Sequence, residues 1–199
     1  MDADQVVHNE RFSGNDWALD EVERVQYSDC AFYDVDWSEA RLTGCTFSHC
    51  EFGNVRFNAS VLTTCALIQS TLTRCSFFDA TLSGCKLTGT QFIDCGLRPL
   101  TVDGGDWAFV SLRGQNLTAV RFGGLRLRDA DFTGADLTRA DLRGADLTAA
   151  RLKDAVLKGA DLRGADLNAV DLKGVDVTGA KLDLNQAGLF AAAYGAIIS

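Results

Sequence analysis

Residues 130–164 read ADFTG-ADLTR-ADLRG-ADLTA-ARLKD-AVLKG-ADLRG, so a large apolar residue returns every five positions. The register extends from Phe12 to Leu182, and Leu, Phe, Trp, Tyr or Val holds all thirty-five of its positions. A period of five fits neither the 3.6-residue turn of a helix nor the two-residue repeat of a strand. A chain that turns a corner every five residues can bury this stripe, because each corner brings the next large side chain inward.

A second inward position lies two residues before each large one. Ala fills it at every step from 130 to 165, and the first half places all seven cysteines there: Cys30, Cys45, Cys50, Cys65, Cys75, Cys85 and Cys95. Alternating large and small side chains fill a narrow tube without voids. We therefore interpret the cysteines as core residues, since free Cys behaves as a small hydrophobe. A metal or redox site at Cys45, His49 and Cys50 is the weaker alternative, because His49 falls at an outward corner.

The corners follow from the position two after each large residue, where Gly occurs thirteen times and Asp six. These residues tolerate the positive φ that the third residue of a type II turn requires. Four corners close a square coil of twenty residues, which predicts an all-β solenoid, a right-handed quadrilateral β-helix of almost nine coils and about 43 Å. Pro99 cannot adopt positive φ, so a type VI turn with a cis Arg98–Pro99 bond is expected. Leu100 and Gly105 should make the rod irregular there.

These residues carry a family resemblance. The runs Ala130–Gly134, Ala140–Gly144 and Ala160–Gly164 resemble the A(D/N)LxG unit of pentapeptide-repeat proteins. The resemblance covers residues 12–182 and implies the square β-helix. We expect a leader at 1–11, the repeats at 12–182, and a helix for capping or dimerisation at 183–199.

Composition argues against several functional classes. No apolar run approaches eighteen residues, so no transmembrane helix and no membrane association are expected. The first fifteen residues lack the layout of a signal peptide, and seven interior cysteines favour a reducing cytoplasm. His8 and His49 are the two histidines, and a filled tube offers no concave site, so we expect no enzyme, catalytic residue, cofactor or metal.

Charge is the more informative property. The chain carries a net charge of −8, and residues 1–100 hold fourteen acids against seven bases. An acidic protein should not bind nucleic acid directly. The candidate partner-facing acids form an N-terminal group and a later group that repeats before Leu, Phe or Val: Asp16, Asp20, Glu21, Glu23, Asp34 and Asp36; then Asp131, Asp136, Asp141, Asp146, Asp161, Asp166, Asp171 and Asp176. The plainer interpretations are solubility for the first group and local hydrogen bonds to backbone for the second.

The C-terminal segment has helical spacing, and Gly195 is a plausible C-cap. A helix would cap the open solenoid end, yet its apolar surface exceeds what a narrow tube needs. We predict an isologous homodimer. The expected interface residues are Leu184, Leu189, Phe190, Ala193, Tyr194, Ile197 and Ile198.

This tail and the irregular stretch 97–103 resemble the MfpA and AlbG type of pentapeptide-repeat protein, which are similar to the Qnr quinolone-resistance proteins. The resemblance implies a head-to-head dimer that DNA gyrase takes for a DNA segment, with inhibition of gyrase or protection from fluoroquinolones or albicidin. Whether topoisomerase IV is also bound stays open. Qnr proteins have projecting loops, whereas this register has no insertion, so any gyrase contact must use the rod faces.

A comparison of charge densities limits the mimicry. A dimer would carry one net charge per roughly 5–6 Å, against one per roughly 1.7 Å for duplex DNA. Mimicry is therefore credible only where acids concentrate. A scaffold or adaptor for another protein partner is the alternative function.

Overall fold

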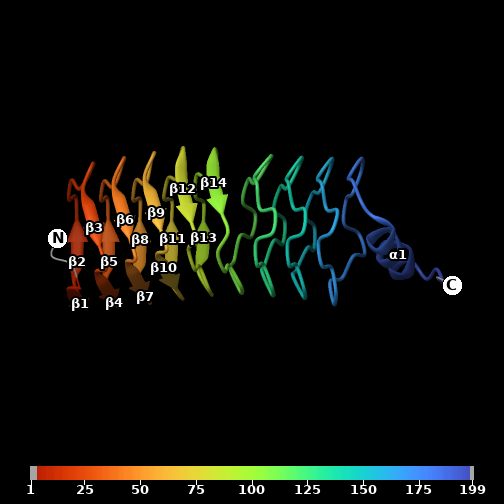
Figure 1. Ribbon diagram of the computed structural model, residues 1–199, viewed down its shortest axis with the longest axis horizontal. Coiled ribbons are helices and arrows are strands. Elements are labelled where there is room, and N and C mark those ends of the chain that lie inside the picture. Colours follow the sequence, from red (N-terminus) through yellow and green to blue (C-terminus); the bar gives the residue numbers. More distant parts are fainter. Residues whose placement is uncertain (1–3, 198–199) are drawn as a thin grey trace.

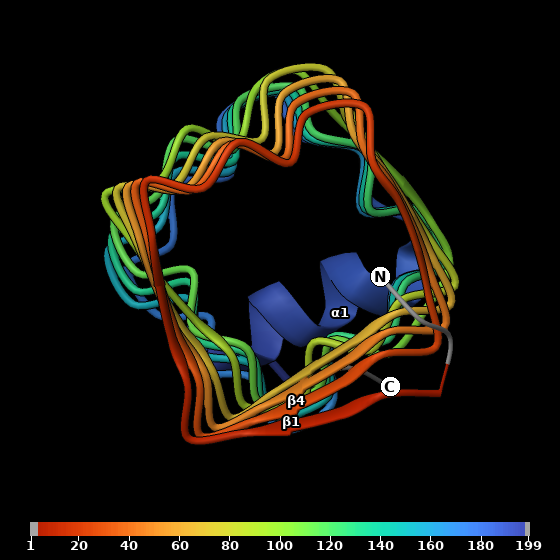
Figure 2. The same ribbon diagram turned by 90° about the vertical axis from the view of Figure 1, so that its left-hand side faces the viewer.

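The computed structural model describes residues 4–197 and forms a single rod of stacked coils that ends in a helix (Figure 1). Parallel pairing joins residues twenty apart, from Val6↔Gln26 at the start to Asp161↔Lys181 near the end. Seen from the N-terminal end, the chain runs clockwise as it recedes, so the solenoid is right-handed (Figure 2). The predicted quadrilateral β-helix is confirmed.

Three of the four faces carry short parallel strands over about the first five turns. The first face has β1 (Val6–His8), β4 (Gln26–Ser28), β7 (Thr46–Ser48) and β10 (Ala66–Ile68). The second has β2 (Arg11–Ser13), β5 (Ala31–Tyr33), β8 (Glu51–Gly53), β11 (Thr71–Thr73) and β13 (Gln91–Ile93). The fourth has β3 (Glu21–Glu23), β6 (Arg41–Thr43), β9 (Val61–Thr63), β12 (Ala80–Ser83) and β14 (Leu100–Asp103).

The third face, which includes Asp16, Asp36 and Arg56, is joined by isolated bridges, as are all faces of the later coils. In those later coils the corners close as turns: the N–H of Ala135, for example, donates to the carbonyl of Phe132 at 2.9 Å. Corners that end in Cys lack this bond among the described residues. Coils with Ala at the small inward position therefore close their corners with a hydrogen-bonded turn, whereas coils with Cys at this position have strands on their faces.

The corner residues confirm the predicted backbone. Every fifth residue from Asp4 to Gly179 has positive φ except Pro99. Pro99 instead follows a cis peptide bond with Arg98, as the sequence predicts.

Large side chains stack in columns inside the tube. The rings of Tyr27 and Phe47 lie 5.0 Å apart and nearly parallel, and those of Phe32 and Phe52 lie 4.9 Å apart. Six of the seven cysteines are buried, and Cys95 is half-buried. Each thiol also donates to a carbonyl one coil earlier, as Cys65 does to Leu42 at 3.3 Å. The interpretation of the cysteines as core residues is confirmed.

The two ends of the rod differ. At the N-terminal end β1 already pairs with β4, so pairing begins inside the segment expected as a leader. Phe12 and Trp17 are only half-buried there, and Asp20 is exposed although its register position predicts an inward slot. Within residues 4–197, no coil stacks on the outer side of Asp20 to cover it. At the other end α1 (Leu184–Ala193) lies across the tube (Figure 2). Its ten residues are too few to cross a bilayer, and the described residues contain no longer helix.

Candidate interaction surfaces

The N-terminal acids gather on two neighbouring faces of the first two coils. We call Asp16, Asp20, Glu21, Glu23, Asp34 and Asp36 the N-terminal acidic patch. Asp16 and Asp36 lie in register on the third face, and Glu21 and Glu23 flank buried Val22 on the fourth. All six except Asp36 are exposed. The fold therefore brings this group together as one surface.

Neighbouring side chains neutralise part of this patch. Asp36 pairs with Arg56 at 2.6 Å, and this hydrogen bond lowers the pKa of Asp36 to about 2. Glu23 lies 3.5 Å from Arg24, which also pairs with Asp4. Asp34 accepts a hydrogen bond from the amide of Asn54 at 2.6 Å. Asp16, Asp20, Glu21 and Asp34 form no ion pair with a described arginine or lysine, because the Asn54 amide is neutral.

The later acids accept hydrogen bonds from the backbone. We call Asp131, Asp136, Asp141, Asp146, Asp161, Asp166, Asp171 and Asp176 the Asp ladder. In each, one carboxylate oxygen accepts the N–H two residues on, as Asp136 does from Thr138 at 2.9 Å. Such bonds stabilise the turn locally. The predicted local hydrogen bonding is confirmed, and it holds the carboxylates in place.

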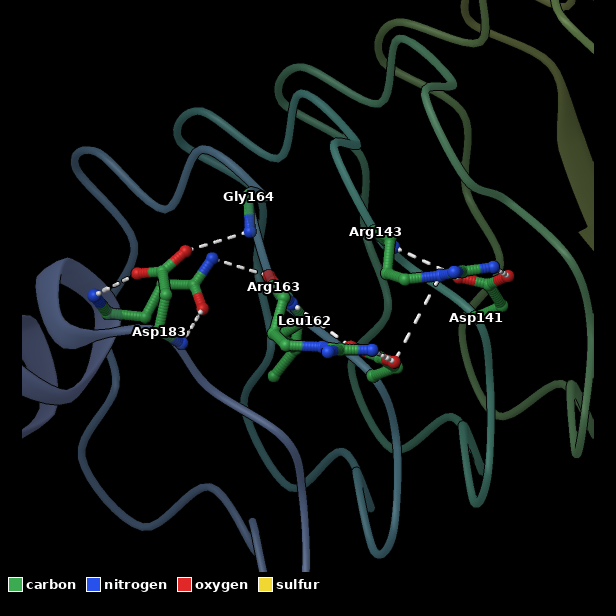
Figure 3. A network of polar contacts seen from close by, with 8 residues as sticks. Asp141, Arg143, Leu162, Arg163, Gly164 and Asp183 are labelled. Carbon is green, nitrogen blue, oxygen red and sulfur yellow. Dashed lines mark hydrogen bonds and ion pairs between the residues drawn. The ribbon is translucent and has the colours of Figure 1, made fainter.

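Arginines offset the middle of the ladder but not its end. Arg143 binds Asp141 and Arg163 binds Asp161, at 2.6 and 2.7 Å (Figure 3). Asp146 lies 3.7 Å from Arg128. The last three ladder residues, Asp166, Asp171 and Asp176, are exposed and have no ion pair among the described residues, although Lys173 follows Asp171 in sequence. Unpaired acids thus remain near both ends of the rod.

Asp131 differs from the rest of the ladder because it is buried. Burial alone would raise its pKa, but hydrogen bonds from Thr133 and Arg113, with the nearby charge of Arg151, lower the pKa to about 2. Its Oδ2 lies 3.0 Å from Arg113 and 3.1 Å from Arg151. Asp131 is therefore a poor candidate for partner contact. Arg151 also separates it from Asp171 in their column.

The helix cap depends on two residues that the register did not single out. Asp183 is the N-cap of α1 and forms a capping box with Gln186. Asp183 Oδ2 also accepts the N–H of Gly164 at 2.8 Å, and buried Gln186 donates to the carbonyls of Leu162 and Ala165 (Figure 3). These bonds satisfy backbone groups of the last coils. The D-x-x-Q spacing before an apolar run could have identified both residues.

The expected dimer residues separate into two sets. Phe190 and Ala193 are half-buried against the core, so they belong to the cap. Leu184, Tyr194 and Ile197 are 91%, 70% and 94% exposed, and Leu189 is 37% exposed. Ile198 lies outside the described residues. Beside α1, a groove of about 610 Å³ runs between residues 164–168 and the helix, lined by Leu184 and Leu189.

Metal-binding and thiol chemistry find no support in the geometry. Within residues 4–197, no three His, Cys, Asp or Glu side chains come together as a metal site. His49 is exposed at its corner and bonds Gln69 at 2.8 Å, away from Cys45 and Cys50. Burial raises the pKa of Cys50 to about 12, so its thiol stays protonated.

A closed rod of stacked four-sided coils, with charged outer faces and an apolar end, defines a β-solenoid protein. The pattern of the family described as pentapeptide repeats (8 copies) matches residues 28–63, 56–94, 116–154 and 145–183. The chain belongs to the pentapeptide-repeat family. No curated protein sequence matches it.

Solved structures of a plasmid-mediated fluoroquinolone resistance protein share the fold. One trypsin-treated variant of QnrB1 is 22% identical, with 98% of each chain covered and a TM-score of 0.65. Full-length QnrB1 is 20% identical over 96% of this chain and 100% of its own, with a TM-score of 0.53. At this identity the likeness concerns the fold alone.

Proposed function

We propose that this protein binds DNA gyrase as a dimer of acidic rods and either inhibits the enzyme or protects it from a poison such as a fluoroquinolone or albicidin. The observation that carries the proposal is the apolar end: Leu184, Tyr194 and Ile197 are exposed beside the last coil. A two-fold contact there would join two rods end to end. The fold shared with QnrB1 over nearly the whole chain supports this choice of partner.

The charges favour contact at particular places on such a dimer. Asp166, Asp171 and Asp176 lie nearest α1 and would flank the dimer centre, while Asp16, Asp20 and Glu21 would lie at the far ends. Basic DNA-binding grooves attract carboxylates held in fixed positions. The Asp ladder meets this requirement because turn hydrogen bonds orient each carboxylate. Topoisomerase IV also binds a DNA segment in a basic groove, so we propose it as a second possible partner.

A protein scaffold or adaptor is the second candidate function. The ion pairs of Asp141 with Arg143 and of Asp161 with Arg163 favour it, because they remove charge that DNA mimicry would use. One assay separates the two functions: gyrase supercoiling with and without the protein, each with and without the poison. Gyrase binding predicts lower supercoiling or less poison-stabilised cleavage at micromolar protein. An unchanged reaction in all four conditions would favour the adaptor.

A further inference from the structure

The wall of the rod is split at one place. Between residues 94–105 and the coil that follows at 113–125, no backbone hydrogen bond forms among the described residues. One coil later, the same positions carry seven: from the N–H groups of Gly114, Leu117, Ala119, Phe122, Gly124, Asp136 and Asp141. The pairing is intact on either side of the split, at Phe92–Ser111 and Trp107–Arg126. The break in pairing therefore covers the third and fourth faces, about half of one coil, while the first and second faces stay paired.

Figure 1 shows this opening from the side. Along the upper edge, the gap between β14 and the next coil is visibly wider than the gaps between other coils, while the lower edge stays evenly spaced. A cavity of about 450 Å³ occupies the gap, lined by residues 97–101 on one wall and 118–121 on the other. We call this opening the wall split.

The side chains at the inner small positions explain the split. Other coils place Ala, Cys, Ser, Thr or Val at most of these positions, whereas this region has the larger side chains of Leu100, Gln115 and Leu125. Oversized groups in a close-packed tube push neighbouring coils apart. Pro99 adds to the effect, because it has no N–H to donate to the next coil. Gln115 partly compensates: its side chain bonds the carbonyl of Phe92 and the N–H of Cys95.

The split leaves a free strand edge in the side of the rod. In a regular coil, the N–H groups of Val102 and Gly104 and the carbonyl of Leu100 would pair with residues 121–123. Here β14 is the outer strand of its five-stranded sheet. An exposed edge of this kind accepts a further strand through main-chain hydrogen bonds. A widened gap between two coils suits one inserted strand, which needs about 4.8 Å on each side.

Two arginines give the cavity its charge. Arg98 and Arg121 lie on opposite walls, and neither forms an ion pair with a described carboxylate. Arg98 donates to Asn116 at 2.8 Å. The charge of Arg98 also acts on Asp136. Hydrogen bonds from Thr138 lower the pKa of Asp136 most, and the charge of Arg98 lowers it further at longer range. In a chain of net charge −8, this basic opening favours a carboxylate-bearing ligand.

We infer that the wall split is a docking site for an extended acidic peptide, which adds to β14 as a strand and places carboxylates against Arg98 and Arg121. The partner is a segment of another protein with acidic residues alternating with small apolar ones. Main-chain bonds to the β14 edge supply affinity, and the two arginines supply selectivity for charge. This site is separate from the acidic surfaces and from α1, so it does not depend on gyrase binding.

The binding test uses a fluorescein-labelled peptide, acetyl-Val-Glu-Val-Glu-Val-amide, and fluorescence anisotropy with the full chain. We expect saturable binding that falls at least tenfold in the Arg98→Glu/Arg121→Glu double variant. Arg139→Glu, an exposed corner arginine of a regular coil, should bind as the parent does. Replacing Glu by Lys in the peptide should abolish binding. Equal binding by the double variant, an equal loss in Arg139→Glu, or no saturable binding by the parent would overturn the proposal.

The strand geometry needs its own test, because two arginines alone could hold an acidic peptide. Methylating alternate peptide nitrogens blocks main-chain hydrogen bonds without changing charge, and we expect at least tenfold weaker binding. The unmethylated peptide should slow amide hydrogen exchange at Val102 and Gly104 at least tenfold. Exchange at Thr46, whose N–H is paired with Val25 on the first face, should not change. Unchanged exchange at β14, or full binding of the methylated peptide, would exclude strand addition.

Discussion

The hydroxyl of Tyr194 accepts a hydrogen bond from the backbone N–H of Gly174 at 3.1 Å, so the end of α1 is tied to the last coil through a side chain that is otherwise 70% exposed. Tyr194 thus has two roles that a single substitution would confuse. Its ring is available to a second copy, while its hydroxyl holds the cap. Phe190, within α1, is half-buried against the core and belongs to the cap.

Dimerisation should therefore be tested at Leu184 and Ile197, which are 91% and 94% exposed. We expect Leu184→Glu/Ile197→Glu to be monomeric by light scattering and to melt at the temperature of the diluted, monomeric parent, because neither side chain supports the cap. Phe190→Asp/Tyr194→Asp should lower the melting temperature as well, since it buries a charge and removes the bond to Gly174. A Leu184/Ile197 variant that stays dimeric would place the interface elsewhere.

Acid should unfold the rod partly through Asp131. Its pKa is about 2 in the fold and about 3.9 in an unfolded chain, so its contribution is complete above pH 4 and is lost as pH falls towards 2. We expect Asp131→Asn to lose about 2 kcal/mol at pH 7 and to show a flatter decline below pH 4. Urea unfolding at several pH values measures both.

Asp166→Asn is the matched control, because Asp166 makes the same turn hydrogen bond but has no arginine partner among the described residues. Its loss should be below about 1 kcal/mol at pH 7. Equal losses in the two variants would show that the arginines around Asp131 contribute nothing.

The interior cysteines should be inert in the folded protein. Cys50 is 1% exposed, and burial raises its pKa to about 12. At pH 8 we expect no reaction of Cys50 with a thiol reagent until denaturant is added, since the thiolate is the reactive form. Thr64→Cys places a thiol at an exposed corner and should react within minutes. Mass mapping identifies the labelled residue, and rapid native labelling of Cys50 would contradict its buried position.

Two glycines should differ sharply in their tolerance of Ala. A Cβ on Gly105 would lie 2.2 Å from the carbonyl oxygen of Cys85, whereas one on Gly134 would meet nothing within 4 Å. Both have positive φ. We expect Gly134→Ala to lose about 1 kcal/mol from the left-handed backbone alone and Gly105→Ala about 3 kcal/mol or more. Similar unfolding free energies would mean that the coil at Cys85 moves easily.

Charge neutralisation distinguishes the two acidic surfaces. Changing Asp166, Asp171 and Asp176 to Asn should weaken gyrase binding severalfold, and the loss should be greatest at low salt because exposed charges are screened. The matched set is Asp16, Asp20, Glu21, Glu23, Asp34 and Asp36 changed to Asn or Gln. If only this second set weakens binding, contact lies at the rod ends. If neither does, the acids serve solubility.

The sequence predicts the solenoid because a large apolar residue recurs at one spacing, and a five-residue period permits few folds. Phe32 and Cys50 could be placed inside, and His49 outside, from position alone. Asp20 is exposed as a candidate partner-facing acid although its register position is inward, because that position is covered only where a neighbouring coil stacks on it. The capping role of Gln186 was missed because this residue lies beyond the last register position, Leu182, although the D-x-x-Q spacing of its capping box is present in the sequence.

The wall split was predicted only as an irregularity at Leu97–Asp103. Its extent depends on how Leu100, Gln115, Val120 and Leu125 pack together across adjoining coils, and pattern does not give such packing. The ion pairing of the Asp ladder has the same origin. Arg143 could be matched to Asp141 by sequence distance, but the contact of Arg113 with Asp131 joins residues eighteen apart.

The twenty-residue register also makes the rod a mechanism for setting angles. Removing one pentapeptide from the middle would leave every large side chain inward, but it would rotate everything before the deletion by a quarter turn relative to α1. Removing four would restore the alignment and shorten the rod by about one strand spacing, 4.8 Å. The length of the rod and the rotation of its first coil relative to α1 can therefore each be changed in whole pentapeptides without disturbing the core. The unbroken run from Phe12 to Leu182 fixes one value of each.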